Sequence, residues 1–140
     1  MVRSALPAVA AFALLLGACS RLPERALIPV PPSTLAGGWQ RVTLDTPPAA
    51  AAPEPLEALK PAQRVRASYR LRGSTIFVDA YAMPSQASAF EAQQKWRNEA
   101  GALAFHRSNV FIVCASEGAE QAALSAFSKT LEEAWLGGRK

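Results

Sequence analysis

The stretch Arg64-Val65-Arg66-Ala67-Ser68-Tyr69-Arg70-Leu71-Arg72 decides how the chain folds. Apolar and polar residues alternate almost strictly along it, and a period of two is typical of a strand with one buried side. Successive side chains of a strand point to opposite sides of the sheet. The sequence therefore predicts a strand whose arginines face away from a core. The predicted core residues are Val65, Ala67, Tyr69 and Leu71.

A return strand is predicted to follow over residues 75–83. Gly73 and Ser74 separate it from the first strand, and such a dipeptide suits a two-residue hairpin turn. The pairs predicted from this turn are Leu71 with Ile76, Tyr69 with Val78, and Ala67 with Ala80. All six residues are apolar, so we expect a hairpin with one apolar side and one side rich in arginine.

The same order of elements occurs twice along the chain. Residues 67–100 align without gaps with residues 101–134, at an offset of 34, and a predicted helix beginning at Pro84 ends the first unit. The second helix has Leu124, Phe127, Leu131 and Trp135 on one face. The predicted fold is therefore α+β: two strand-strand-helix repeats form a four-stranded antiparallel sheet with two helices on one face.

The N-terminal residues have the layout of a secretory signal. Arg3 precedes an apolar run from Ala5 to Leu16, which is shorter than the roughly 20 residues that span a bilayer. The run Leu16-Gly17-Ala18-Cys19 resembles the lipobox of bacterial lipoproteins. That resemblance implies cleavage before Cys19 and lipid attachment to its thiol. The alternative is an ordinary secretory signal in which Cys19 is incidental.

Four segments are predicted from these patterns. Residues 1–18 form the signal peptide, residues 19–38 the lipidated cysteine and a proline-rich tether, residues 39–61 a short strand and a Pro/Ala-rich loop, and residues 62–137 the α+β domain. The lipoprotein resemblance implies a partner, the membrane, which the chain contacts through its lipid anchor. Ser20 after the cysteine implies an outer-membrane location facing the periplasm.

The sequence contains few of the residues and motifs that form catalytic or metal sites. The chain of 140 residues has two cysteines, one histidine and a net charge of +4. Cys114 lies in an apolar run and is expected to be a buried strand residue, while His106, beside the second turn, is expected to be solvated. The motifs of zinc sites, phosphate loops and nucleophile elbows are not found in the sequence. We therefore expect no catalytic residues, no metal and no cofactor, and nucleic acid is not an expected partner.

The arginine side of the first hairpin is the candidate binding face. Its predicted residues are Arg64, Arg66, Arg70, Arg72, Phe77 and Tyr81. Guanidinium groups recognise carboxylates and phosphates, and aromatic rings add contact area. One interpretation is a surface for an envelope protein, an anionic envelope component or a second copy of the chain. The other is a solvated strand face on which arginine stems cover apolar atoms.

One further resemblance concerns the mature domain. The run Phe77-Val78-Asp79-Ala80-Tyr81-Ala82-Met83, followed by Ala87-Ser88-Ala89-Phe90, resembles an uncharacterised bacterial envelope domain family, which implies no known activity. The sequence thus predicts a membrane-anchored envelope lipoprotein that acts as a non-enzymatic binding module. The alternative is an envelope enzyme or a small-ligand carrier.

Overall fold

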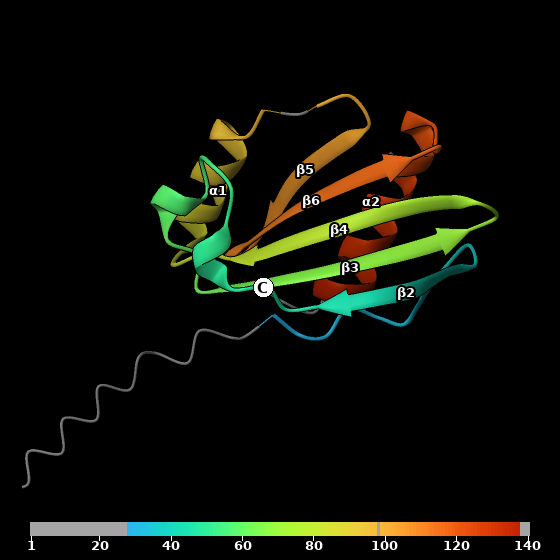
Figure 1. Ribbon diagram of the computed structural model, residues 1–140, viewed down its shortest axis with the longest axis horizontal. Coiled ribbons are helices and arrows are strands. Elements are labelled where there is room, and N and C mark those ends of the chain that lie inside the picture. Colours follow the sequence, from blue (N-terminus) through green and yellow to red (C-terminus); the bar gives the residue numbers. More distant parts are fainter. Residues whose placement is uncertain (1–27, 98, 138–140) are drawn as a thin grey trace, which may run out of the picture.

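The computed structural model describes residues 28–97 and 99–137, so the predicted signal peptide and Cys19 lie outside the described residues. The strands are β1 (Thr34–Leu35), β2 (Trp39–Asp45), β3 (Gln63–Leu71), β4 (Ser74–Ala82), β5 (Ala102–Arg107) and β6 (Val110–Glu117); the helices are α1 (Gln86–Lys95) and α2 (Gln121–Leu136), with 3-10 turns η1 (Ala49–Ala51) and η2 (Glu57–Leu59). Within the described residues, these strands form one six-stranded antiparallel sheet of order β1-β2-β3-β4-β6-β5 (Figure 1). The α+β class is confirmed, but the sheet is wider than the four strands predicted.

The hairpin of β3 and β4 turns one position earlier than predicted. Arg72 and Gly73 occupy the turn with φ values of 46° and 81°, and Leu71 pairs with Ser74. Positive φ at both central residues is the geometry of the hairpin turn that matches strand twist, and glycine suits its second position. The pairing therefore shifts by two residues, which moves Arg72 into the turn and leaves the side chains of the two strands on their predicted sides.

The two helices lie on opposite sides of the sheet, so the prediction that both cover one face is wrong. Leu124 and Phe127 of α2 pack in one cluster with Tyr69. Ala89 and Ala92 of α1 belong to a second cluster. Figure 1 shows α2 behind the sheet, whereas α1 lies beside η1 and η2 at one end of the strands.

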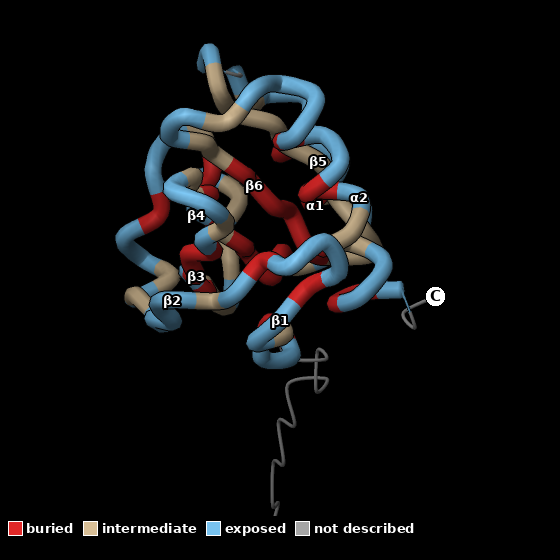
Figure 2. Tube along the Cα trace, turned by 90° about the vertical axis from the view of Figure 1, so that its right-hand side faces the viewer, coloured by how far each residue is buried: buried red, intermediate tan, exposed pale blue. Residues whose placement is uncertain are grey.

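Strand β6 explains why both sides need a cover. Every residue from Val110 to Cys114 is buried (Figure 2), although neighbours along a strand point to opposite sides. Phe111 and Val113 require an apolar partner on the side away from α2, and α1 supplies it. The second turn, at residues 108–109, also lies two residues further from the first turn than the predicted offset of 34. The gapless repeat is therefore not an exact structural repeat.

The folded unit begins earlier than the predicted boundary at residue 62. Residues 28–35, which we call the N-terminal strap, lie against the core that α2 covers. Ile28 and Leu35 are buried there. Trp135 Nε1 donates a hydrogen bond to the Pro29 carbonyl at 2.7 Å, and the Tyr69 hydroxyl donates one to the Pro32 carbonyl at 2.6 Å. Proline has no N–H but keeps its carbonyl acceptor, so side-chain donors hold a segment that the sequence predicts to be a free tether.

The Pro/Ala-rich segment after β2 also has a defined place. Ala52 is buried, and Leu56 is completely enclosed in the cluster beneath α1. The short strand predicted within residues 39–61 is present as β2, which pairs with β3 through a bulge between Arg41 and Thr43. The loop that follows contains the 3-10 turns η1 and η2. Together with α1, this segment covers one end of the sheet side that faces away from α2.

Candidate binding face

The predicted arginines point away from α2, but they do not form one continuous exposed surface. On the side of the sheet away from α2, α1 and the η1–η2 segment cover the end around Tyr81 and Phe111. The remaining part, which we call the open face, is uncovered by any described element. Its residues are Arg66, Arg70, Thr75, Phe77 and Ala115, which share one side of β3, β4 and β6.

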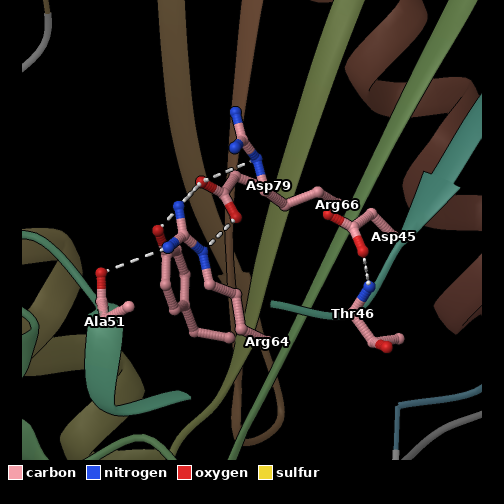
Figure 3. Close-up of polar contacts among 7 residues, drawn as sticks. Asp45, Thr46, Ala51, Arg64, Arg66 and Asp79 are labelled. Carbon is pink, nitrogen blue, oxygen red and sulfur yellow. Dashed lines mark hydrogen bonds and ion pairs between the residues drawn. The ribbon is translucent and has the colours of Figure 1, made fainter. Parts of the chain in front are cut away.

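Arg64 is held in an internal cluster rather than presented to a partner (Figure 3). Its Nε donates to Asp79 Oδ1 at 2.9 Å, and its Nη2 donates to Asp79 Oδ2 at 2.7 Å. A third donor, Nη1, reaches the Ala51 carbonyl at 3.2 Å. The Tyr81 hydroxyl donates to Asp79 Oδ2 at 2.9 Å, and the Arg64 guanidinium lies 5.3 Å from the centre of the Tyr81 ring. The cluster thus fastens the η1 segment to the sheet.

The electrostatics of this cluster fix its charge state. The hydrogen bond to Asp79 raises the pKa of Arg64 and outweighs the opposing effect of burial. Burial, together with the Asp79 charge, raises the pKa of Tyr81 well above its ordinary value. Arg64 therefore stays charged and Tyr81 stays neutral around pH 7. Neither of these two groups is poised to exchange a proton as a general acid or base at that pH.

The other predicted residues have different surroundings. The Arg66 side chain is 53% exposed, with its Nε 3.9 Å from Asp79 Oδ2. Phe77 is 40% exposed, whereas Tyr81 is only 1% exposed. Arg70 is exposed on the strand, but Arg72 belongs to the turn and not to the strand face. Arg66, Arg70 and Phe77 are therefore the exposed residues of the predicted face, whereas Arg64 and Tyr81 are enclosed beside them and Arg72 lies in the turn.

Carboxylates balance the arginines of this side of the sheet. Asp45 and Asp79 lie directly opposite Arg66 on its two neighbouring strands. Glu117 lies opposite Thr75, which is itself opposite Arg70. Charges of both signs at this spacing reduce the attraction for a polyanion, because each cation has a nearby anion. The face is better suited to a protein surface of mixed charge.

A groove beside the open face was not predicted from the sequence. It has a volume of about 580 Å³ and lies between the Pro53–Pro55 segment and the residues that follow α1. Ala102, Val113 and Ala115 form part of its lining. A smaller hollow of about 280 Å³ includes Arg66 and Phe77. The groove could not be predicted from the sequence, because one of its walls is the Pro/Ala-rich loop, whose place in the fold depends on packing against other segments.

The single histidine and the described cysteine serve the packing. His106 lies in β5, half-buried rather than solvated, where its Nδ1 contacts Gln93 Oε1 and its ring meets Phe90 edge-on. Cys114 is fully buried, as predicted, and burial raises the pKa of its thiol to about 12. Among residues 28–97 and 99–137, no group of three potential ligands from His, Cys, Asp and Glu is arranged to hold a metal ion.

Comparison with known proteins assigns the chain to no family. Neither the family models, nor the curated proteins, nor the solved structures include a match to the chain. In the part of the chain that the structure describes, no helix combines the length and apolar character needed to cross a membrane.

Proposed function

We propose that the chain is a lipid-anchored protein of the bacterial envelope whose domain binds a partner protein through the open face. The observation that carries the binding role is the exposed ring of Phe77. It lies in the middle of the sheet, with Ser68 and Ala115 as its cross-strand neighbours. An aromatic side chain near arginines is typical of the residues that contribute most to protein interfaces.

The anchor is proposed from the sequence. Cys19 follows Leu16, Gly17 and Ala18 at the end of an apolar run. Two or three acyl chains at this thiol and its amino group would give stable membrane attachment, because each buried methylene contributes about 0.8 kcal/mol. Ser20 is compatible with an outer-membrane location that faces the periplasm. In this arrangement the domain presents its open face to the periplasm or to neighbouring membrane proteins.

A small-ligand carrier or an envelope enzyme is the second candidate. The groove of about 580 Å³ supports it, since small-molecule sites range from about 300 to 1,000 Å³. A carrier would release a small molecule on denaturation, which mass spectrometry of the purified protein detects. A binding module of the proposed kind releases no small molecule on denaturation, and its binding of the partner depends on Phe77 instead.

Photocrosslinking in intact cells tests the binding role. A photoreactive phenylalanine analogue at position 77 should give one discrete adduct, because the side chain lies at the centre of the proposed interface. The same analogue at Ala123, an exposed position on α2, is the matched control. An adduct of twice the chain's mass identifies a second copy as the partner. Equal, diffuse labelling from both positions would show that the open face is only solvated.

Metabolic labelling with a palmitate analogue tests the anchor. Cys19→Ser should abolish the label and leave an uncleaved precursor, because the modified thiol is required before cleavage in lipoproteins of this type. Cys114→Ser is the control and should keep the label. If Cys19→Ser still matures at the same site and remains in the membrane fraction, the lipoprotein proposal is wrong.

A further inference from the structure

We infer that the groove beside Trp96 binds an extended peptide segment of the partner protein, with one side chain in the groove and another at Phe77. This inference rests on the proposed binding function and assigns it a site and a ligand class. We call this site the Trp96 groove; it is bounded by Pro53, Pro55, Trp96, Glu99, Val113 and Ala115.

The floor of the Trp96 groove is continuous with the open face. Ala115 lies directly opposite Phe77, and Val113 lies directly opposite Asp79. Phe77 and Asp79 also line the neighbouring hollow, which Arg66 borders on its other side. The two hollows share no lining residue, but their floors lie on the adjacent strands β6 and β4, which are about 4.8 Å apart. They are therefore neighbouring hollows along a line that crosses the strands.

The placement of two hollows on adjacent strands favours an extended chain over a compact molecule. Every second side chain of an extended peptide points to the same side, at intervals of about 7 Å. Such a peptide can place one side chain over Val113 and Ala115 and another beside Phe77. A compact ligand would fill only one of the two hollows. A peptide can thus contact both hollows at once.

Trp96 contributes a donor that lacks an acceptor. Its ring is half-buried and lies 5.7 Å from the ring of Phe111. Its indole nitrogen is enclosed, with no hydrogen-bond partner among the described residues. Buried indole N–H groups usually have a partner. A small rotation of the ring toward the groove would present this N–H to a peptide carbonyl, which is the acceptor that an extended backbone supplies.

The charges at the mouth of the groove also fit a peptide. Glu54, Glu99 and Arg97 line it together with Lys95, and the Lys95 ammonium is already held by Glu91 at 2.8 Å. The rim therefore carries both signs, so a strongly anionic polymer would meet Glu54 and Glu99 unfavourably. The walls from Pro53 and Pro55 lack N–H groups and leave apolar surface for a side chain.

A random dodecapeptide library displayed on phage is the probe. It is selected against the full chain purified in detergent, and the enriched peptides are then titrated by intrinsic tryptophan fluorescence. We expect peptides that share an apolar residue and bind in the micromolar range. Ala115→Arg, which fills the floor, should weaken their binding at least tenfold. Ala123→Arg, the same change on exposed α2, should leave it unchanged.

Trp96→Phe separates a binding role from a structural one. The variant keeps a ring against Phe111 but removes the unpaired N–H, so the thermal midpoint should stay within a few degrees of the parent. Peptide affinity should fall several-fold and the fluorescence change should disappear. The inference is wrong if the selected peptides bind the Ala115→Arg and Trp96→Phe variants with the same affinity as the parent protein. It is also wrong if the phage selection enriches no peptide. Photocrosslinks from position 77 that persist in both variants would then leave the proposed function standing without this site.

Discussion

Arg64 reaches diagonally across the β3–β4 hairpin to Asp79, and not to Tyr81, which is its direct partner in the strand register. The direct partner of Asp79 is Arg66, yet the Arg66 guanidinium stays 3.9 Å away and largely exposed. The Arg64 side chain is 12% exposed and that of Asp79 is 23% exposed. One arginine of the predicted face therefore stabilises the domain, while its neighbour is free to meet a partner.

The first prediction concerns this difference between the two arginines. Asp79→Ala should lower the free energy of unfolding by about 2 kcal/mol, because it leaves the enclosed Arg64 without its charged acceptor. Arg66→Ala should change stability by no more than about 0.5 kcal/mol, as expected for an exposed residue. Urea denaturation measures both. A double-mutant cycle of Asp79→Ala with Arg64→Met should give a positive coupling energy; additive effects would show that the two-point contact contributes nothing.

The second prediction tests whether the N-terminal strap belongs to the core. Leu35→Ala should destabilise the domain by about 2–4 kcal/mol, because the side chain is only 6% exposed and its removal leaves a cavity. Val30→Ala is the control within the same strap and should have almost no effect, since Val30 is 68% exposed. Thermal or urea denaturation of the two variants decides the point. Similar stabilities for the two variants would show that the strap does not contribute to the core and is a tether, as the sequence predicts.

The third prediction is a loss of stability at alkaline pH. Burial raises the pKa of Cys114 from 9.0 to about 12 and that of Tyr69 from 10.0 to about 12. In the unfolded chain these groups release their protons near pH 9 and 10, before the folded chain does. The free energy of unfolding should therefore be constant below about pH 9 and fall between pH 9 and 12. Cys114→Ala should delay the onset by about one pH unit, which urea denaturation at successive pH values would reveal.

The fourth prediction concerns access to the same thiol. Cys114 lies between the sheet and α2 and is fully buried. A thiol reagent such as DTNB should therefore react with it only at the rate of unfolding at pH 8, and rapidly in urea. Leu131→Ala, which removes a neighbouring side chain from the same core, should accelerate the reaction. If Cys114 of the parent protein reacted rapidly, and at the same rate with and without urea, it could not lie on the side of β6 that faces α2.

Local patterns in the sequence predicted most of the strands and both helices, but not β1 or the way in which the elements assemble. The alternation from Arg64 to Arg72 predicts both the strand and the sides of its residues, since a period of two depends only on neighbouring residues. The sides of the two helices could not be predicted in this way. Phe111 and Val113 lie in a continuous apolar run, and such a run indicates a strand buried on both sides without naming its covers.

The candidate binding face was predicted only in part, because strand alternation gives the side of a residue but not what covers it. Strand alternation placed Arg66, Arg70 and Phe77 on one side, and the structure agrees. The burial of Tyr81 depends on α1, whose side of the sheet strand alternation does not predict, and on Leu56, which lies well before Tyr81 in the sequence. The Trp96 groove likewise requires contacts between segments that no short-range pattern connects. Side-chain facing was thus accessible from sequence, whereas coverage by distant segments was not.

The N-terminal strap has a consequence for where the domain can go. Eight residues separate Cys19 from Ile28, whose backbone N–H is bound to Gln63 Oε1 at 2.8 Å. Even fully extended, that link is about 30 Å long. In the proposed anchored form, the domain is therefore confined to a thin layer above the bilayer. A partner in the same membrane would be confined to the same layer, so the two proteins would meet at a higher effective concentration than in free solution.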